Sequence, residues 1–151
     1  MRLGAVVVAF LVAATAAHAD PVVVDVPAIL AKGKAEVTKT LGKPQACAKV
    51  KQGEKCQWRD GALEVVFIGG AADWLTITAD IPYGADGLPA LGFKPAKPTF
   101  SNQFVARWSN GLEPLAQDGK GATMVVFLQT MEMQPGAPGR AAMTLVKGTT
   151  P

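Results

Sequence analysis

This chain of 151 residues has a single histidine, His18, and it lies in the N-terminal segment before Asp20. Histidine is the usual general base near neutral pH and the commonest neutral metal ligand. Residues 20–151 therefore cannot form a Ser-His-Asp or a Cys-His arrangement, and a zinc site there would need cysteines and carboxylates alone. The 12 carboxylates are dispersed and form no recurring pair motif, which disfavours a hydrolase that uses carboxylates alone. We predict no catalytic residues, no metal ligands and no cofactor.

The apolar run at the N-terminus is too short to span a bilayer. The run from Leu3 to Ala14 covers about a dozen residues, whereas a transmembrane helix needs about 20. Arg2 precedes this run, and Ala17-His18-Ala19 provides small residues at a cleavage position before Asp20. This is the layout of a secretory signal peptide. We predict that residues 1–19 are removed and that the protein is periplasmic or secreted. We also predict no membrane anchor, since the residue directly after the cleavage site is Asp20 and not a cysteine that could carry a lipid.

Cysteine is scarce as well, with only Cys47 and Cys56. They lie nine positions apart, and in an exported chain this favours one disulfide over a metal pair or a nucleophile. Closing a loop of about ten residues stabilises a fold by roughly 2 to 3 kcal/mol on the chain-entropy account. We predict a structural disulfide.

Positive and negative charges are nearly balanced, so neither sign dominates the chain. Without residues 1–19 the chain has 14 basic and 12 acidic residues, a net charge of +2 that gives no argument for a nucleic-acid partner. Seven lysines nevertheless fall in one stretch with only Glu36 and Glu54 opposing them: Lys32, Lys34, Lys39, Lys43, Lys49, Lys51 and Lys55. A solvated face explains this cluster, and an acidic partner is the alternative.

Turn and helix signals divide the chain into units. The first unit, 20–81, has a predicted helix at Lys34 to Leu41, with Gly42 and Pro44 as its end signals. A cysteine loop follows. Three antiparallel strands are then expected at 56–60, 63–68 and 74–79, joined at Asp60-Gly61 and at Gly69-Gly70.

The second unit, 82–131, repeats this plan in shortened form. Leu41-Gly42 recurs as Leu91-Gly92 and Trp58 as Trp108, each 50 positions on, and both tryptophans precede a hairpin dipeptide. Chance identity in a chain rich in alanine and glycine is the competing explanation. Residues 132–151 form a C-terminal hairpin or tail, with a strand expected at 140–147. The predicted fold class is α+β: an antiparallel sheet with short helices on one face, in two tandem units of one helix and three strands.

The sequence from Val37 through Leu41-Gly42-Lys43-Pro44, with the strands around Trp58, 63–68 and 74–78, resembles the OmlA/SmpA family of small outer-membrane proteins. Tandem copies of such a unit resemble the architecture of the β-lactamase inhibitor protein. The similarity covers about 29–79 well and 88–130 poorly. It implies a non-catalytic protein of the cell envelope that binds other proteins. The chain departs from that family in lacking a lipidated cysteine.

Strand alternation predicts which side chains face away from the helices. If Leu75 and Ile77 are core, the opposite face carries the candidate binding residues Trp74, Thr76, Thr78, Met124, Val126 and Leu128. An open apolar face of this kind marks a docking surface. The alternative is an ordinary core, covered by the tail, by a second copy of the chain or by strands that lie elsewhere than this pattern predicts.

Two functions of different classes follow. The first is an exported, non-catalytic envelope protein that binds another protein, with a homo-oligomer left open. The second is a proteinaceous inhibitor of a secreted hydrolase, in which the loop 81–87, containing Tyr83 and Asp86, enters the enzyme cleft. The same loop is equally explained as a linker between the two units.

Overall fold

The computed structural model describes residues 21–109, 112–113, 123–129 and 140–148. The predicted signal peptide and the second hairpin dipeptide, Asn110-Gly111, lie outside these residues. Within the described part of the chain, no helix is both long enough and apolar enough to cross a membrane.

The predicted helix is confirmed. Helix α1 spans Lys34–Leu41 and follows a 3-10 turn, η1, at Val26–Ala28. The Glu36 carboxylate accepts a hydrogen bond of 3.3 Å from the backbone N–H of Gly33, which places negative charge at the N-terminus of the helix, where the helix dipole favours it. Gly42 ends the helix with a φ of 85°, a conformation that glycine adopts without a steric penalty.

The expected cysteine loop is a β-hairpin, so the prediction of three strands after the helix was wrong. Strand β1 (Ala46–Val50) pairs antiparallel with β2 (Gly53–Trp58), and Cys47 lies directly opposite Cys56. The predicted disulfide joins these two residues. The first unit therefore consists of one helix and four strands, where one helix and three strands had been predicted.

The next two strands agree closely with the sequence pattern. Strand β3 (Leu63–Ile68) alternates between buried and half-buried residues, and β4 (Ala71–Ile77) pairs with it antiparallel. The expected turn between β2 and β3 is the 3-10 turn η2 (Arg59–Gly61), in which φ is positive at all three residues. Gly69 and Gly70 also have positive φ, which explains why glycines occupy the turn between β3 and β4.

The second half has shorter elements. Strand β5 (Ile81–Pro82) is followed by two 3-10 turns, η3 (Gly84–Gly87) and η4 (Pro89–Leu91), in place of an α-helix. Gly92 ends η4 in the left-handed conformation, as Leu91-Gly92 had indicated. The remaining strands are β6 (Phe100–Ser101), β7 (Val105–Trp108), β8 (Thr123–Gln129) and β9 (Arg140–Gly148).

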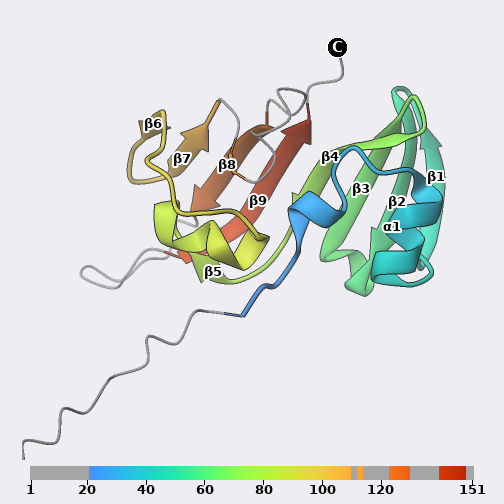
Figure 1. The fold of residues 1–151 in the computed structure, drawn as a ribbon, viewed down its shortest axis with the longest axis horizontal. Coiled ribbons are helices and arrows are strands. Elements are labelled where there is room, and N and C mark those ends of the chain that lie inside the picture. Colours follow the sequence, from blue (N-terminus) through green and yellow to red (C-terminus); the bar gives the residue numbers. More distant parts are fainter. Residues whose placement is uncertain (1–20, 110–111, 114–122, 130–139, 149–151) are drawn as a thin grey trace, which may run out of the picture.

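The described strands form one antiparallel sheet in the order β1-β2-β3-β4-β9-β8-β7-β6, with β5 also pairing to β9 (Figure 1). Strand β9 pairs with β8 as a hairpin, as expected, and it also pairs with β4. The C-terminal strand therefore lies in the middle of the sheet and joins its two halves.

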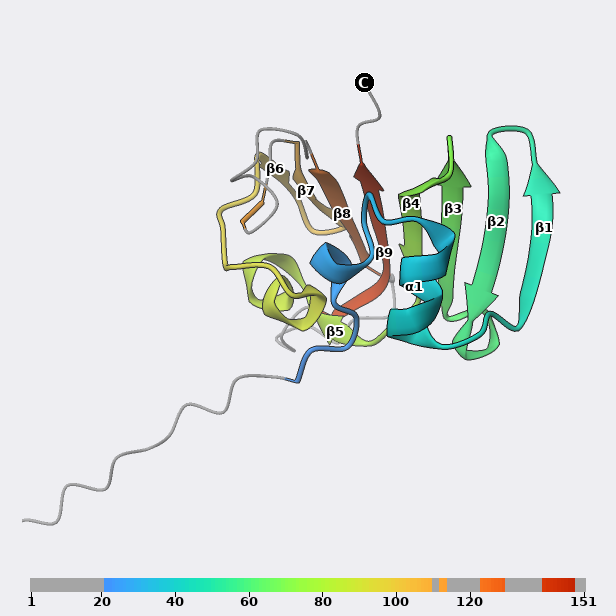
Figure 2. The same cartoon turned by 45° about the vertical axis from the view of Figure 1, so that its right-hand side comes forward.

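The helices lie on one side of this sheet, so the fold is α+β with short helices on one face. Figures 1 and 2 show α1, the turn η1 and the turns η3 and η4 on the same side of the strands. The core between the two layers includes Val26, Ile29 and Val37 from the N-terminal segment and Leu88 and Leu91 from the second half. The strands contribute Leu63, Val65, Leu75, Ile77, Trp108 and Val146.

Candidate functional site

The face of the sheet away from the helices carries Trp74, as the alternation in β4 predicts. Leu75 and Ile77 are buried against the helices, whereas the side chain of Trp74 is 37% exposed. Thr76 is half-buried and Thr78 is exposed on the same side. A tryptophan seldom leaves this much of its ring in water, because the ring gains more from burial than most side chains do.

A pocket of about 410 Å³ opens beside Trp74 on this face. Its floor is apolar, because Val66 and Ile68 of β3 project from the sheet next to the indole ring. The remaining lining residues are polar: Gln52, Asp73, Thr76 and Lys147. An apolar floor with a few polar groups at its border is the usual composition of a binding pocket.

An irregularity in β4 lies next to this pocket. Val66 is opposite Trp74 while Phe67 is opposite Ala72, so Asp73 is an additional residue in β4 at a β-bulge. Asp73 borders the pocket, but its carboxylate lies beside Leu30 and Gly148 on the helix side of the sheet, so the side chains of Asp73 and Trp74 still point to opposite faces. The Asp73 side chain is only 3% exposed. The bulge therefore adds a residue to β4 without bringing the buried Asp73 carboxylate to the indole.

Lys147 of β9 provides the cation of the site. Trp74 and Lys147 are directly opposite each other in the β4–β9 pair. The ammonium nitrogen of Lys147 lies 5.8 Å from the centroid of the Trp74 ring, within the range of a cation–π interaction. An acidic group on a ligand that covered the indole would therefore meet this ammonium group.

The candidate binding residues did not include Gln52, Val66, Ile68, Asp73 or Lys147, which line the pocket. Val66 and Ile68 share one alternation in 63–68, so the signal for both was present in the sequence. The contribution of Lys147 depends on the position of β9 between β4 and β8, which no local pattern indicates.

The three candidate residues of the second half are separated from Trp74 by strand β9. The backbone register places Met124 opposite Lys147, Val126 opposite Leu145 and Leu128 opposite Met143. Only their backbone positions are described. Met143 and Leu145, with partly exposed side chains, lie between the two groups, so they extend the open face from the first half toward the second.

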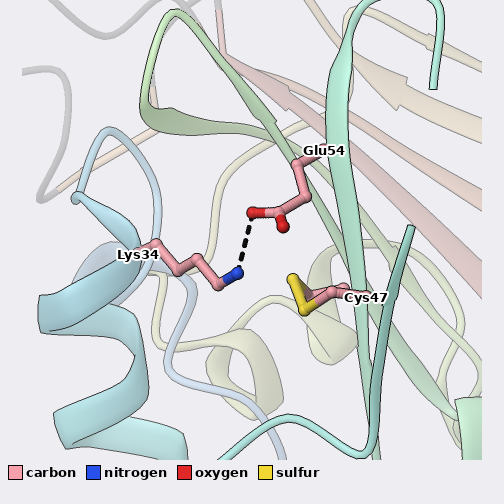
Figure 3. Close-up of polar contacts among 4 residues, drawn as sticks. Lys34, Cys47 and Glu54 are labelled. Carbon is pink, nitrogen blue, oxygen red and sulfur yellow. Dashed lines mark hydrogen bonds and ion pairs between the residues drawn. A yellow bond between two sulfur atoms is a disulfide. The ribbon is translucent and has the colours of Figure 1, made fainter. Parts of the chain in front are cut away.

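A second cluster lies on the helix side of the sheet, at β1 and β2 (Figure 3). The sulfur atoms of Cys47 and Cys56 and a carboxylate oxygen of Glu54 lie within 4.8 Å of one another. Both sulfurs are joined in the disulfide, and Glu54 accepts a hydrogen bond of 2.8 Å from the Lys34 ammonium group. The cluster therefore holds an ion pair beside a disulfide.

The loop 81–87, considered above as an inhibitory loop, is packed against the sheet. Ile81 is buried and pairs with Ala141 of β9, and Gly87 is also buried. The hydroxyl of Tyr83 donates a hydrogen bond of 2.6 Å to the carbonyl of Asn102, and burial raises the pKa of Tyr83. Asp86 is exposed. This segment connects the halves by pairing with β9, and it does not form an isolated loop tip.

No protein-family model, no curated protein and no solved structure matches the chain.

Proposed function

We propose that this protein is an exported, non-catalytic component of the cell envelope that binds another protein through the face around Trp74. The observation that carries the proposal is the indole of Trp74, which is 37% exposed beside a pocket with an apolar floor. Exposed aromatic side chains next to such pockets commonly anchor protein partners, because covering them removes a large apolar area from water.

The borders of the pocket support a protein as the ligand. Thr76 and Gln52 offer hydrogen-bonding groups, and Lys147 offers a positive charge beside the apolar floor formed by Val66 and Ile68. Protein interfaces combine an apolar centre with a polar rim in this way. The partner is expected to insert an apolar side chain beside Trp74 and to place a polar or acidic group near Lys147.

Export is supported by two features of different kinds. The N-terminal segment has the layout of a signal peptide, and Cys47 and Cys56 form a disulfide, which persists in oxidising compartments. The absence of histidine after His18 supports a role without catalysis, since it removes the commonest general base.

We further propose that the two halves are copies of one unit, as in the architecture that the OmlA/SmpA resemblance implies. The strand order supports this, because the second strand from each edge, β2 or β7, ends at a tryptophan, Trp58 or Trp108. Each indole N–H donates a hydrogen bond of 2.9 Å to a backbone carbonyl, that of Gly42 for Trp58 and that of Ala96 for Trp108.

An affinity-capture experiment tests the proposed function. Residues 20–151 are immobilised as wild type, as Trp74→Ala and as Phe104→Ala, and each is exposed to an extract of periplasmic proteins. Phe104 is the matched control, because it is 42% exposed and does not line the pocket. The proposal predicts a protein that the wild type and Phe104→Ala capture and that Trp74→Ala does not. Equal capture by all three would contradict it.

A further inference from the structure

Strand β1 forms an open edge of the sheet. Among the described strands it pairs with β2 alone. An unpaired edge presents backbone N–H and C=O groups that another extended chain can pair with. This edge lies four strands from β9 and its Lys147, and none of the β1 residues lines the Trp74 pocket.

The register shows which backbone groups of β1 point outward. The Cα atoms of Cys47 and Cys56 are 4.1 Å apart, the short spacing of a non-hydrogen-bonded pair in an antiparallel ladder. The N–H and C=O groups of Cys47 therefore point away from β2. Lys49, two residues on and opposite Glu54, presents its backbone groups in the same direction. Ala46 and Ala48 direct their groups toward β2.

The disulfide compensates for the weak packing of this strand. The residues from Ala46 to Lys49 are all exposed and only Val50 is half-buried, so β1 gains little from apolar burial. The covalent bond from Cys47 to the fully buried Cys56 attaches the edge to the core (Figure 3). An edge held in this way is ordered before a partner arrives, which reduces the entropy lost on binding.

The edge is also positively charged. Lys43, Lys49 and Lys51 are exposed, and none of them forms a hydrogen bond or an ion pair with another described residue. Of the acidic residues nearby, Glu54 is paired with Lys34, and Asp60 accepts a hydrogen bond from Gln45. Edge lysines protect a sheet from self-association, and a second copy of β1 would bring lysines together. An acidic strand would instead be attracted.

We propose that the edge of β1 binds an extended, acidic segment of a partner protein by strand addition. The backbone groups of Cys47 and Lys49 would supply the hydrogen bonds, and Lys43, Lys49 and Lys51 would select acidic side chains. This interaction does not depend on the proposed role of Trp74. It gives the chain a second binding surface, with a chemistry different from that of the pocket.

The test uses a capped synthetic peptide of alternating glutamate and valine, titrated into residues 20–151 with the disulfide formed. Hydrogen exchange of the Cys47 and Lys49 amides is followed by NMR. The proposal predicts that the peptide slows exchange at these two amides and that its affinity falls as salt is added, because salt screens the lysines. A peptide with lysine in place of glutamate should not bind.

Two variants separate the backbone contribution from the charge. Lys49→Pro removes an N–H that points outward, so the β1–β2 ladder stays intact, as prolines on edge strands generally allow. It should abolish peptide binding, whereas Lys49→Gln, which keeps the N–H and loses the charge, should weaken binding only several-fold. Trp74→Ala should leave peptide binding unchanged.

Several results would overturn the proposal. These are unchanged exchange at Cys47 and Lys49 in saturating peptide, equal binding by Lys49→Pro, or protection of these amides that depends on protein concentration alone. The last result would identify a second copy of the chain as the occupant. The exchange measurement on the wild type decides the question even if Lys49→Pro fails to fold.

Discussion

The indole N–H of Trp58, at the end of β2, donates a hydrogen bond of 2.9 Å to the carbonyl of Gly42, at the end of α1. The Trp58 side chain is buried, so its N–H finds a backbone acceptor at the end of the helix in place of water. This contact ties the helix to the sheet in the first half of the chain.

Trp58→Phe should lower the free energy of unfolding by about 1 to 2 kcal/mol. Phenylalanine keeps most of the packing, but the Gly42 carbonyl loses its donor. Urea unfolding followed by circular dichroism measures the change. Trp74→Phe, at an exposed indole, is the control and should change stability by less than about 0.5 kcal/mol. Equal losses in the two variants would argue against the role of the hydrogen bond.

Removing the disulfide should destabilise the protein and free the edge strand. Replacing Cys47 and Cys56 together by alanine is expected to lower the free energy of unfolding by roughly 2 to 3 kcal/mol on the chain-entropy account. Because β1 is exposed, amide exchange should accelerate more in 46–50 than in β3. Intact-mass analysis showing two free thiols in periplasmically expressed protein would contradict the premise that Cys47 and Cys56 form a disulfide.

The stability should also depend on pH through Glu64. Gln57 donates a hydrogen bond to the Glu64 carboxylate and Lys55 forms an ion pair with it, and together they lower the pKa of Glu64 in spite of burial. The folded state thus binds a proton less readily than the unfolded state. The resulting stabilisation is present above the unfolded pKa and is lost as the pH falls through the folded pKa.

Glu64→Gln tests this linkage, because glutamine keeps the size of the side chain and cannot ionise. The wild type should be more stable than the variant near neutral pH, and the difference should shrink in acid as Glu64 becomes protonated. Urea unfolding of both proteins, once near neutral pH and once in acid, measures this difference in the free energy of unfolding. A difference that is the same at both would show that ionisation of Glu64 does not contribute.

Local signals were sufficient for some elements. Gly42 and Pro44 mark the end of α1, because glycine readily adopts the positive φ that ends a helix and proline cannot continue one. The alternation in 63–68 is that of a strand with one buried face. Strand β1 gave no such signal. Its sequence from Ala46 to Val50 has only one β-branched residue, and its conformation depends on pairing with β2 and on the disulfide.

The site was predicted only in part, because it too depends on pairing between strands and not on local sequence alone. Trp74 followed from alternation, but Lys147 reaches the pocket through pairing between strands far apart in the chain. Such pairings are decided by the packing of the whole sheet. The sequence pattern of 140–147 predicted the strand, and it could not predict that the strand lies at the centre.

A thermal melt distinguishes a docking residue from a core residue at Trp74. Trp74→Ala should lower the free energy of unfolding by only about 1 to 2 kcal/mol, because part of the indole is already in water. Trp58→Ala, at a buried position, is the reference and should lose roughly 3 to 5 kcal/mol. A loss of that size for Trp74→Ala would show that Trp74 belongs to the core.

The most direct test of the account is the dissociation constant of the captured partner, measured by calorimetry for the wild type and for Trp74→Ala. A central aromatic anchor contributes about 2 kcal/mol or more, so the variant should bind about 30-fold more weakly while its fold is unchanged. A change of less than about twofold in a fully folded variant would contradict the proposal that the protein binds through the Trp74 face.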